Sequence, residues 1–257
     1  MSPLHDRLSV CRRCGHDDCA CPCPCFRRCP RLCLRVCGGS AVTAQTVSVV
    51  LFDGFEVLDV FGPVELFSHV PGWTVRFLGP VAGVPVRAAQ GVTVTTESGL
   101  SDLTADGETT DILLVPGGPG TRRLVGDAGF LDLLRTTASR AGTVASVCTG
   151  SALLAAAGLL EGRRATSNKR AWDWVTSQGI RQGGELTGRV DWVARARWVA
   201  DGNLWTSSGV AAGTDMAHAL IADREGLQVA DSVAADIELE VHRDPGDDPF
   251  AVLHGLV

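Results

Sequence analysis

The sequence lacks several features that would assign it to common classes of protein. No apolar run reaches the roughly 18–20 residues that a membrane-spanning helix needs, and the amino terminus has no apolar stretch typical of a signal peptide. Neither the GxGxxG pattern nor the P-loop motif occurs, so we expect no dinucleotide or nucleoside triphosphate site. The formal net charge of −6 disfavours a nucleic-acid-binding surface. We therefore predict a cytoplasmic protein that binds neither membrane nor nucleic acid.

Cysteine is scarce in the main part of the chain, because nine of the ten cysteines lie in residues 1–44. This segment also carries seven Arg against three Asp and has no hydrophobic period. Four residues near its start could ligate zinc: Cys11, Cys14, His16 and Cys19. The alternation of Cys and Pro that follows matches no zinc-finger spacing, and a disulfide framework would need an oxidising compartment. We predict that residues 1–44 are a disordered tail or the product of a start codon assigned too far upstream, with metal binding as the alternative.

Residues 45–257 have the pattern of a single α/β domain. Apolar and β-branched runs predict strands at 46–52, 73–78, 92–96, 111–115 and 143–147. Helical spacing predicts helices at 130–140, 168–177, 209–224 and 227–242, besides those that follow Asp59 and Cys148. A hairpin is expected over 197–207, and a loosely ordered acidic stretch over 244–249. This alternation predicts a mostly parallel sheet with helices on both faces.

Cys148 lies at the junction between the predicted strand 143–147 and the Ala/Leu-rich run that follows Thr149. A side chain there stands at the carboxyl end of a strand, where open parallel sheets bind their ligands. It also stands at the amino end of a helix, whose positive potential stabilises a thiolate. The arrangement is that of a nucleophile elbow with Cys in place of Ser. A buried, inert cysteine at a tight turn is the alternative interpretation.

Two other segments are expected at the same edge of the sheet. Asp59 follows the first strand near the start of a helix, where it would act either as an N-cap or as an acid facing Cys148. Gly117 and Gly118 follow the strand 111–115, and glycine lets backbone N–H groups approach a ligand closely. They predict either a plain turn or a pair of main-chain donors for a developing negative charge.

Five segments together resemble the PfpI-type, glutamine-amidotransferase-like superfamily: LFDGFEVLDVFGPVELF, DILLVPGGPG, SVCTGSALLAAAGLLEGRRATS, DGNLWTSSGVAAGTDMAHAL and the closing DPF. Within it, the sequence is most similar to the isocyanide hydratase branch, over residues 46–250. The resemblance implies a flavodoxin-like three-layer sandwich, a homodimer, a small-molecule substrate and no metal or other cofactor.

The resemblance also implies roles for individual residues. Cys148 would be the nucleophile, Asp59 would pair with it, and Thr149 matches the threonine that follows the cysteine in isocyanide hydratases. Gly117 and Gly118 match the glycines of the PGG motif and would supply backbone donors.

A helix that starts near Gly209 and Val210 would border the substrate pocket, again by resemblance. The sequence departs from its relatives at Asn168, where they commonly carry His. Asparagine cannot act as a base, so this position affects the predicted reaction more than the predicted use of Cys148.

The reaction implied is hydration of an isocyanide to an N-substituted formamide. Cys148 would attack the electrophilic isocyanide carbon to give a thioimidate, and Asp59 would supply a proton and then help water to add. Another Cys-dependent activity, such as that of a deglycase, glyoxalase or amidase, would require a His or Glu near Cys148. A redox or ligand sensor is the third alternative. Related transcription regulators add a helix-turn-helix domain, for which we expect no room before Val257.

Overall fold

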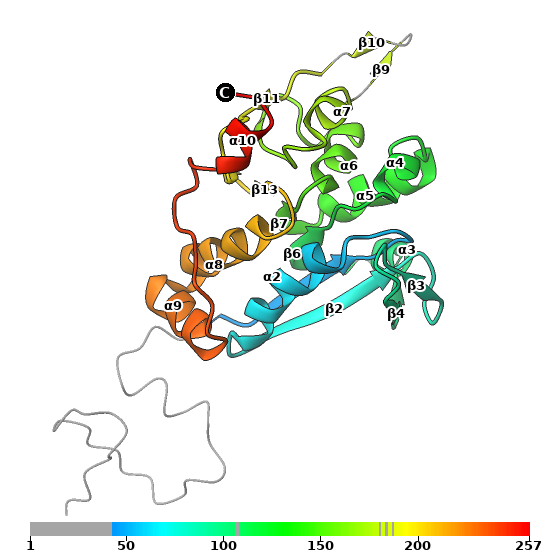
Figure 1. The fold of residues 1–257 in the computed structure, drawn as a ribbon. Coiled ribbons are helices and arrows are strands. Elements are labelled where there is room, and N and C mark those ends of the chain that lie inside the picture. The colour runs from blue at the N-terminus through cyan, green and yellow to red at the C-terminus, as the bar shows by residue number, and fades with distance from the viewer. Residues whose placement is uncertain (1–42, 106–107, 180, 183–184, 187) are drawn as a thin grey trace, which may run out of the picture. The chain divides into compact units, whose positions relative to one another are not determined.

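The computed structural model describes residues 43–105, 108–179, 181–182, 185–186 and 188–257 (Figure 1). Within this part, Thr43–Val257 form one compact unit. The predictions made for the cysteine-rich segment at the start of the chain fall almost wholly on residues 1–42, which lie outside the described residues.

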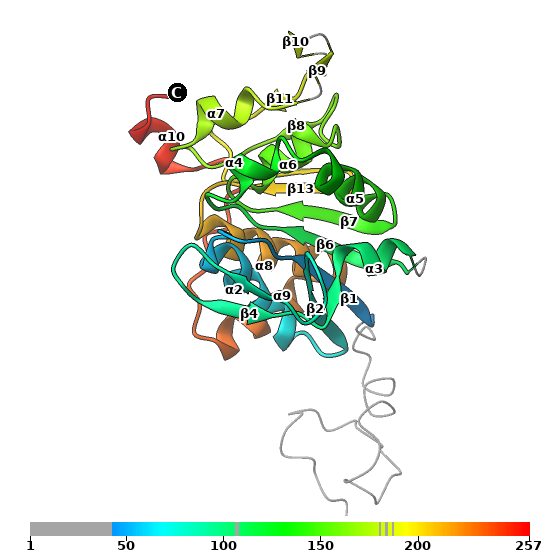
Figure 2. The same cartoon turned by 90° about the vertical axis from the view of Figure 1, so that its right-hand side faces the viewer.

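A seven-stranded sheet runs through the centre of the described residues, in the order β12-β13-β7-β6-β1-β2-β5 (Figure 2). Its strands are β1 (Gln45–Val50), β2 (Trp73–Gly79), β5 (Ser98–Gly99), β6 (Thr110–Val115), β7 (Ala141–Ser146), β12 (Trp198–Asp201) and β13 (Leu204–Ser207). Every neighbouring pair is parallel except the β12–β13 hairpin. This confirms the predicted, mostly parallel sheet.

Helices cover both faces of the sheet. One face carries α2 (Val57–His69), α8 (Ala212–Glu225) and α9 (Leu227–Asp236), which pack against one another. The other carries α3 (Leu100–Ala105), α4 (Thr121–Leu124), α5 (Ala128–Ala138) and α6 (Gly150–Ala156). The central strands are buried on both sides, and all apolar side chains of β6 are fully inaccessible. The architecture is therefore the three-layer, flavodoxin-like sandwich that was predicted.

Shorter elements lie around this core. They are the β3 (Pro85–Arg87) and β4 (Thr93–Thr95) hairpin, β8 (Arg164–Ala165) paired with β11 (Asp191–Trp192), β9 (Arg181–Gln182) paired with β10 (Glu185–Leu186), α7 (Trp172–Thr176) and α10 (Pro249–Leu253).

Two predicted helices are shorter in the structure. The helix expected over 168–177 begins only at Trp172, because the side chain of Asn168 is held in a partly buried contact with Cys148. The helix expected over 227–242 ends at Asp236. In the segment at Asn168, a tertiary contact overrides a local preference for helix.

The acidic stretch 244–249 is not loosely ordered as predicted. Asp248 is buried, and its side chain accepts a hydrogen bond from the Phe250 N–H (3.1 Å), which caps α10. Its own N–H donates to the Arg195 carbonyl (3.0 Å), and the Pro245 carbonyl accepts from the Arg197 N–H (2.8 Å). These contacts with residues far away in the chain were invisible in the composition of the stretch.

Candidate active site

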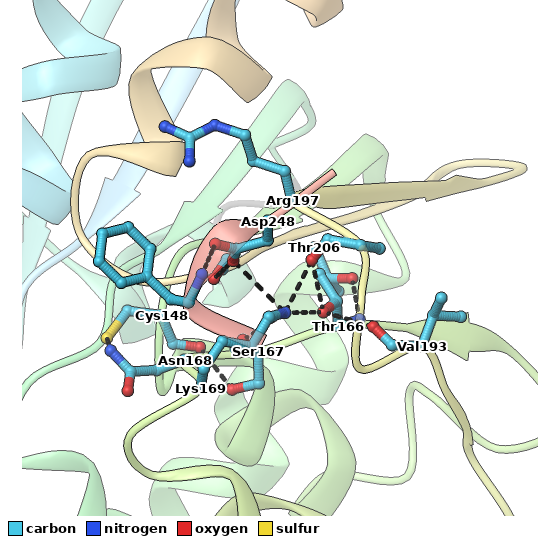
Figure 3. Close-up of polar contacts among 12 residues, drawn as sticks. Cys148, Thr166, Ser167, Asn168, Lys169, Val193, Arg197, Thr206 and Asp248 are labelled. Atoms are coloured by element: carbon cyan, nitrogen blue, oxygen red, sulfur yellow. Dashed lines mark hydrogen bonds and ion pairs between the residues drawn. The ribbon is translucent and has the colours of Figure 1, made fainter. Parts of the chain in front are cut away.

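The carboxyl ends of four adjacent strands converge on one site. Asp59 follows β1, Gly117 follows β6, Cys148 follows β7 and Gly209 follows β13. The segment after β8 adds Asn168, whose side chain reaches Cys148 (Figure 3). The structure thus brings together the residues that the sequence singled out from widely separated segments.

Cys148 has the backbone conformation of a nucleophile elbow. Its φ of 58° lies in the left-handed region, which costs a non-glycine residue about 1–3 kcal/mol. The surrounding structure holds it there, because the Cys148 N–H donates to the carbonyls of Ser207 (3.2 Å) and Ser208 (3.0 Å). The Cys148 carbonyl accepts from the hydroxyls of Ser151 (3.1 Å) and Ser167 (2.9 Å). The strained turn directs the buried side chain toward the site rather than into the helix.

Asn168 is the side chain that donates a hydrogen bond to the sulfur. Its Nδ2 lies 3.1 Å from Cys148 Sγ, and its Oδ1 accepts from the Ala171 N–H (3.0 Å), so the amide presents its NH₂ group to the sulfur. A Cβ at Gly209 would come within 2.7 Å of this Nδ2. Only glycine leaves room there for the amide to reach Cys148.

Asp59 is fully buried and does not cap its helix. Glu56 is the N-cap of α2, so the N-cap interpretation of Asp59 was wrong. Instead, Asp59 Oδ2 accepts from the Gly117 N–H at 2.9 Å. Its Oδ1 has no N–H or O–H donor among the described residues. The thiol of Cys148 is the remaining group that interacts with this carboxyl.

Burial sets the acidity of the pair. It raises the pKa of Asp59 from 3.8 to about 7, against the hydrogen bond from Gly117 and with a smaller rise from the negative charge of Glu56. Burial raises the pKa of Cys148 to about 12, and the charge of Asp59 adds to the rise. The N–H groups of Thr149 and Val210 and the amide of Asn168 lower the pKa, but by less.

The N–H group of Thr149 at the helix amino terminus acts in the expected direction, because it lowers the pKa of Cys148, but it does not leave a thiolate at neutral pH. The raised pKa of Cys148 keeps the proton on sulfur at neutral pH, and desolvation outweighs the N–H groups that face the sulfur. The pKa of Asp59, at about 7, places this carboxyl where it can both take up and release a proton near neutral pH.

The glycine pair after β6 supports Asp59 and Thr149. The Gly117 N–H donates to Asp59, and the Gly118 N–H donates to Thr149 Oγ1 at 3.0 Å. Thr121 Oγ1 donates to the same threonine oxygen at 3.2 Å. A Cβ at Gly117 would lie 2.5 Å from the Thr149 nitrogen. Both glycine N–H groups thus have acceptors within the protein, whereas those of Thr149 and Val210 face the sulfur.

Sequence analysis missed a buried polar cluster beside the elbow, built around Lys169 and Asp248. Only two signals of this cluster were present in the sequence. They were the lysine that directly follows Asn168 and the aspartate of the closing DPF run. Elsewhere in the described part of the chain, no group of His, Cys, Asp and Glu is arranged to hold a metal ion. No described helix has the length and apolar character to cross a membrane.

Comparisons with known proteins identify the family to which the chain belongs. The profile of the DJ-1/PfpI family matches residues 45–223. An isonitrile hydratase from Pseudomonas putida is 32% identical over 195 residues, which cover 76% of this chain and 78% of the relative. A deglycase from Pyrococcus abyssi is 32% identical over 164 residues, covering 64% and 89% of the two chains.

Solved structures show the same fold. A ThiJ/PfpI family protein from Pseudomonas syringae superposes with a TM-score of 0.66 at 26% identity, covering 81% of this chain and 78% of the other. Drosophila melanogaster DJ-1beta has a TM-score of 0.65 at 23% identity, covering 77% and 100%.

Proposed function

Because the chain belongs to the DJ-1/PfpI family, we propose that it is an isocyanide hydratase-like enzyme, which adds water to an isocyanide to give an N-substituted formamide. The similarity to an isonitrile hydratase supports this reaction. We also propose that it works in the cytoplasm. Its resemblance to the isocyanide hydratase branch suggests, in addition, that it needs no cofactor and acts as a homodimer.

One observation carries the proposal. The groups that interact with the Cys148 sulfur are the Asp59 carboxyl, the Asn168 amide and two backbone N–H groups. No histidine or glutamate is among them. A deglycase or glyoxalase reaction was expected to need one of these residues at the sulfur, whereas hydration of an isocyanide needs only a nucleophile and a group that moves protons.

The first step forms the carbon–sulfur bond. Asp59 takes the thiol proton as the Cys148 sulfur attacks the terminal carbon of the isocyanide, and the carboxyl then delivers that proton to the same carbon. The product is a thioimidate, R–N=CH–S–Cys148. The raised pKa of Asp59 suits both halves of this transfer, because the carboxyl gains and loses a proton near neutral pH.

The second step adds water and releases the enzyme. Asp59 removes a proton from water as the water oxygen bonds to the thioimidate carbon, and it then delivers that proton to the nitrogen, which gives R–NH–CH(OH)–S–Cys148. The carbon–sulfur bond then breaks, the hydroxyl proton returns to sulfur through Asp59, and R–NH–CHO leaves. The N–H groups of Thr149 and Val210 and the Asn168 amide stabilise the sulfur when it carries negative charge.

The test is a spectroscopic assay of the purified chain with an aryl isocyanide, beside Cys148→Ala and Asp59→Asn. We expect formamide from the wild type and none from Cys148→Ala. Loss of a general acid–base group costs about 10²–10⁴-fold in rate, so Asp59→Asn should fall by that factor. A folded wild type that produces no formamide would refute the hydratase assignment. A carbonyl substrate and peroxide would then test the deglycase and sensor alternatives.

A further inference from the structure

Lys169 is a buried cation next to the residue that contacts the catalytic sulfur. Its Nζ donates to Thr166 Oγ1 (2.6 Å), the Ala196 carbonyl (2.7 Å) and the Ser167 carbonyl (3.1 Å), which uses all three ammonium protons. Only 4% of the residue is exposed. Figure 3 shows the side chain running from the Asn168 segment toward Asp248.

Asp248 is the anionic partner of this lysine. Its Oδ2 lies 3.7 Å from Lys169 Nζ, and the Ser208 hydroxyl donates to the same oxygen. It belongs to the carboxy-terminal segment, residues 240–257, which folds back onto the domain. The pair therefore joins the end of the chain to the segment that carries Asn168.

Each member of the pair is linked to a residue that contacts Cys148. Lys169 follows Asn168, whose amide donates to the sulfur, and binds the Ser167 carbonyl. Asp248 binds the hydroxyl of Ser208, whose carbonyl accepts from the Cys148 N–H. Lys169 is thus linked through Asn168 to the sulfur of Cys148, and Asp248 is linked through Ser208 to the backbone of Cys148.

A buried ion pair contributes little to the free energy of folding. Removing both charges from water costs much of what their attraction returns, and apolar residues of similar volume often fold equally well. Burial lowers the pKa of Lys169 to about 8 despite the nearby charge of Asp248, which shows that desolvation outweighs the attraction. What apolar residues could not supply is the set of directed hydrogen bonds to the segments around Cys148.

We propose that Lys169 and Asp248 are positioning residues, which hold the Asn168 amide and the Ser208 carbonyl in place around Cys148 and so make thiol reactivity depend on the carboxy-terminal segment. The proposal rests on the proposed function only in taking Cys148 as the reacting group.

The experiment measures alkylation of Cys148 by iodoacetamide as a function of pH in the full-length chain. Trypsin releases the peptide Ala141–Arg163, which contains no other cysteine, so mass spectrometry follows Cys148 alone. Lys169→Met and Asp248→Asn should each raise the pKa of the thiol, because the Asn168 hydrogen bond is weakened, and should therefore slow alkylation about tenfold at a fixed pH near 7, where Lys169 is charged. The double variant should be no slower than either single variant, because both changes break the same link.

Two control variants separate positioning from stability. Arg243→Gln removes an exposed ion pair with Asp231 from the same segment and should leave the alkylation profile unchanged. Val233→Ala opens a cavity in the buried face of α9 and should lower the melting temperature without moving the profile.

If Lys169→Met does not fold, Ser208→Ala tests the same link with both charges retained, and it should slow alkylation severalfold. Variants that melt earlier but keep the wild-type profile would overturn the proposal. A wild type that is alkylated as expected but hydrates no isocyanide would remove the proposed function and leave this inference standing.

Discussion

Replacing Asp59 by Asn should stabilise the protein above neutral pH while it lowers activity by about 10²–10⁴-fold. The carboxyl is fully buried, and one of its oxygens has no N–H or O–H donor among the residues that the structure describes. Burial raises its pKa from 3.8 to about 7. Asparagine keeps an oxygen to accept from the Gly117 N–H and never ionises. It therefore removes the cost of burying a charge and keeps the hydrogen bond.

The sign and size follow from the two pKa values of Asp59. The unfolded chain releases this proton near the ordinary pKa of 3.8, whereas the folded chain holds it up to about pH 7. Stability is therefore fully present below the lower value and declines as the pH rises toward the upper one. The loss amounts to about 4 kcal/mol when complete. The Asn variant escapes this loss, so its advantage should grow by about 2–3 kcal/mol between about pH 5 and pH 8.

The measurement is urea unfolding followed by tryptophan fluorescence, at a series of pH values, for the wild type and the variant. The difference between the two proteins reports the change at residue 59. Asp53→Asn is the matched control, because Asp53 also accepts a backbone N–H, from Arg87 at 2.9 Å, yet is exposed. This variant shows what the replacement of an exposed carboxyl by an amide does in the same assay. If the difference in the free energy of unfolding between Asp59→Asn and the wild type did not change with pH, Asp59 could not be a buried carboxyl with a raised pKa.

Two further predictions concern the contacts of Cys148. Asn168→Ala removes a hydrogen bond that lowers the thiol pKa, so the thiolate fraction should fall and alkylation should slow about tenfold at a fixed pH near 7. An unchanged alkylation rate would mean that the amide does not act on the sulfur. Gly117→Ala would place a Cβ 2.5 Å from the Thr149 nitrogen and 2.8 Å from Asp59 Oδ2, so we expect little folded, active protein, as judged by circular dichroism and the isocyanide assay. A folded variant of wild-type activity would contradict the close packing described here.

The three-layer fold could be predicted because its signals are local. The strands are short apolar runs, the helices carry apolar residues at helical spacing, and Cys148 stands where one pattern changes to the other. Parallel strands place their carboxyl ends at one edge, so the convergence of Asp59, Gly117 and Cys148 also followed from the order of the elements.

What the local patterns could not predict depends on distant segments. The helix expected from Asn168 starts late because buried contacts of Asn168 and Lys169 compete with helical backbone. The acidic stretch around Asp248 is ordered because a lysine far away in the chain meets it in the interior. Neither partner can be found from the residues on either side of it.

The sequence alone therefore determined the order of the elements and the place of the cysteine, because strand and helix preferences act over a few residues. The tertiary structure decided the chemistry of the site. It buried Asp59 beside Cys148, which raised the pKa of both groups, and it turned Asn168 toward the sulfur. Desolvation and hydrogen-bond geometry depend on everything that packs around a group, and only the folded chain brings those groups together.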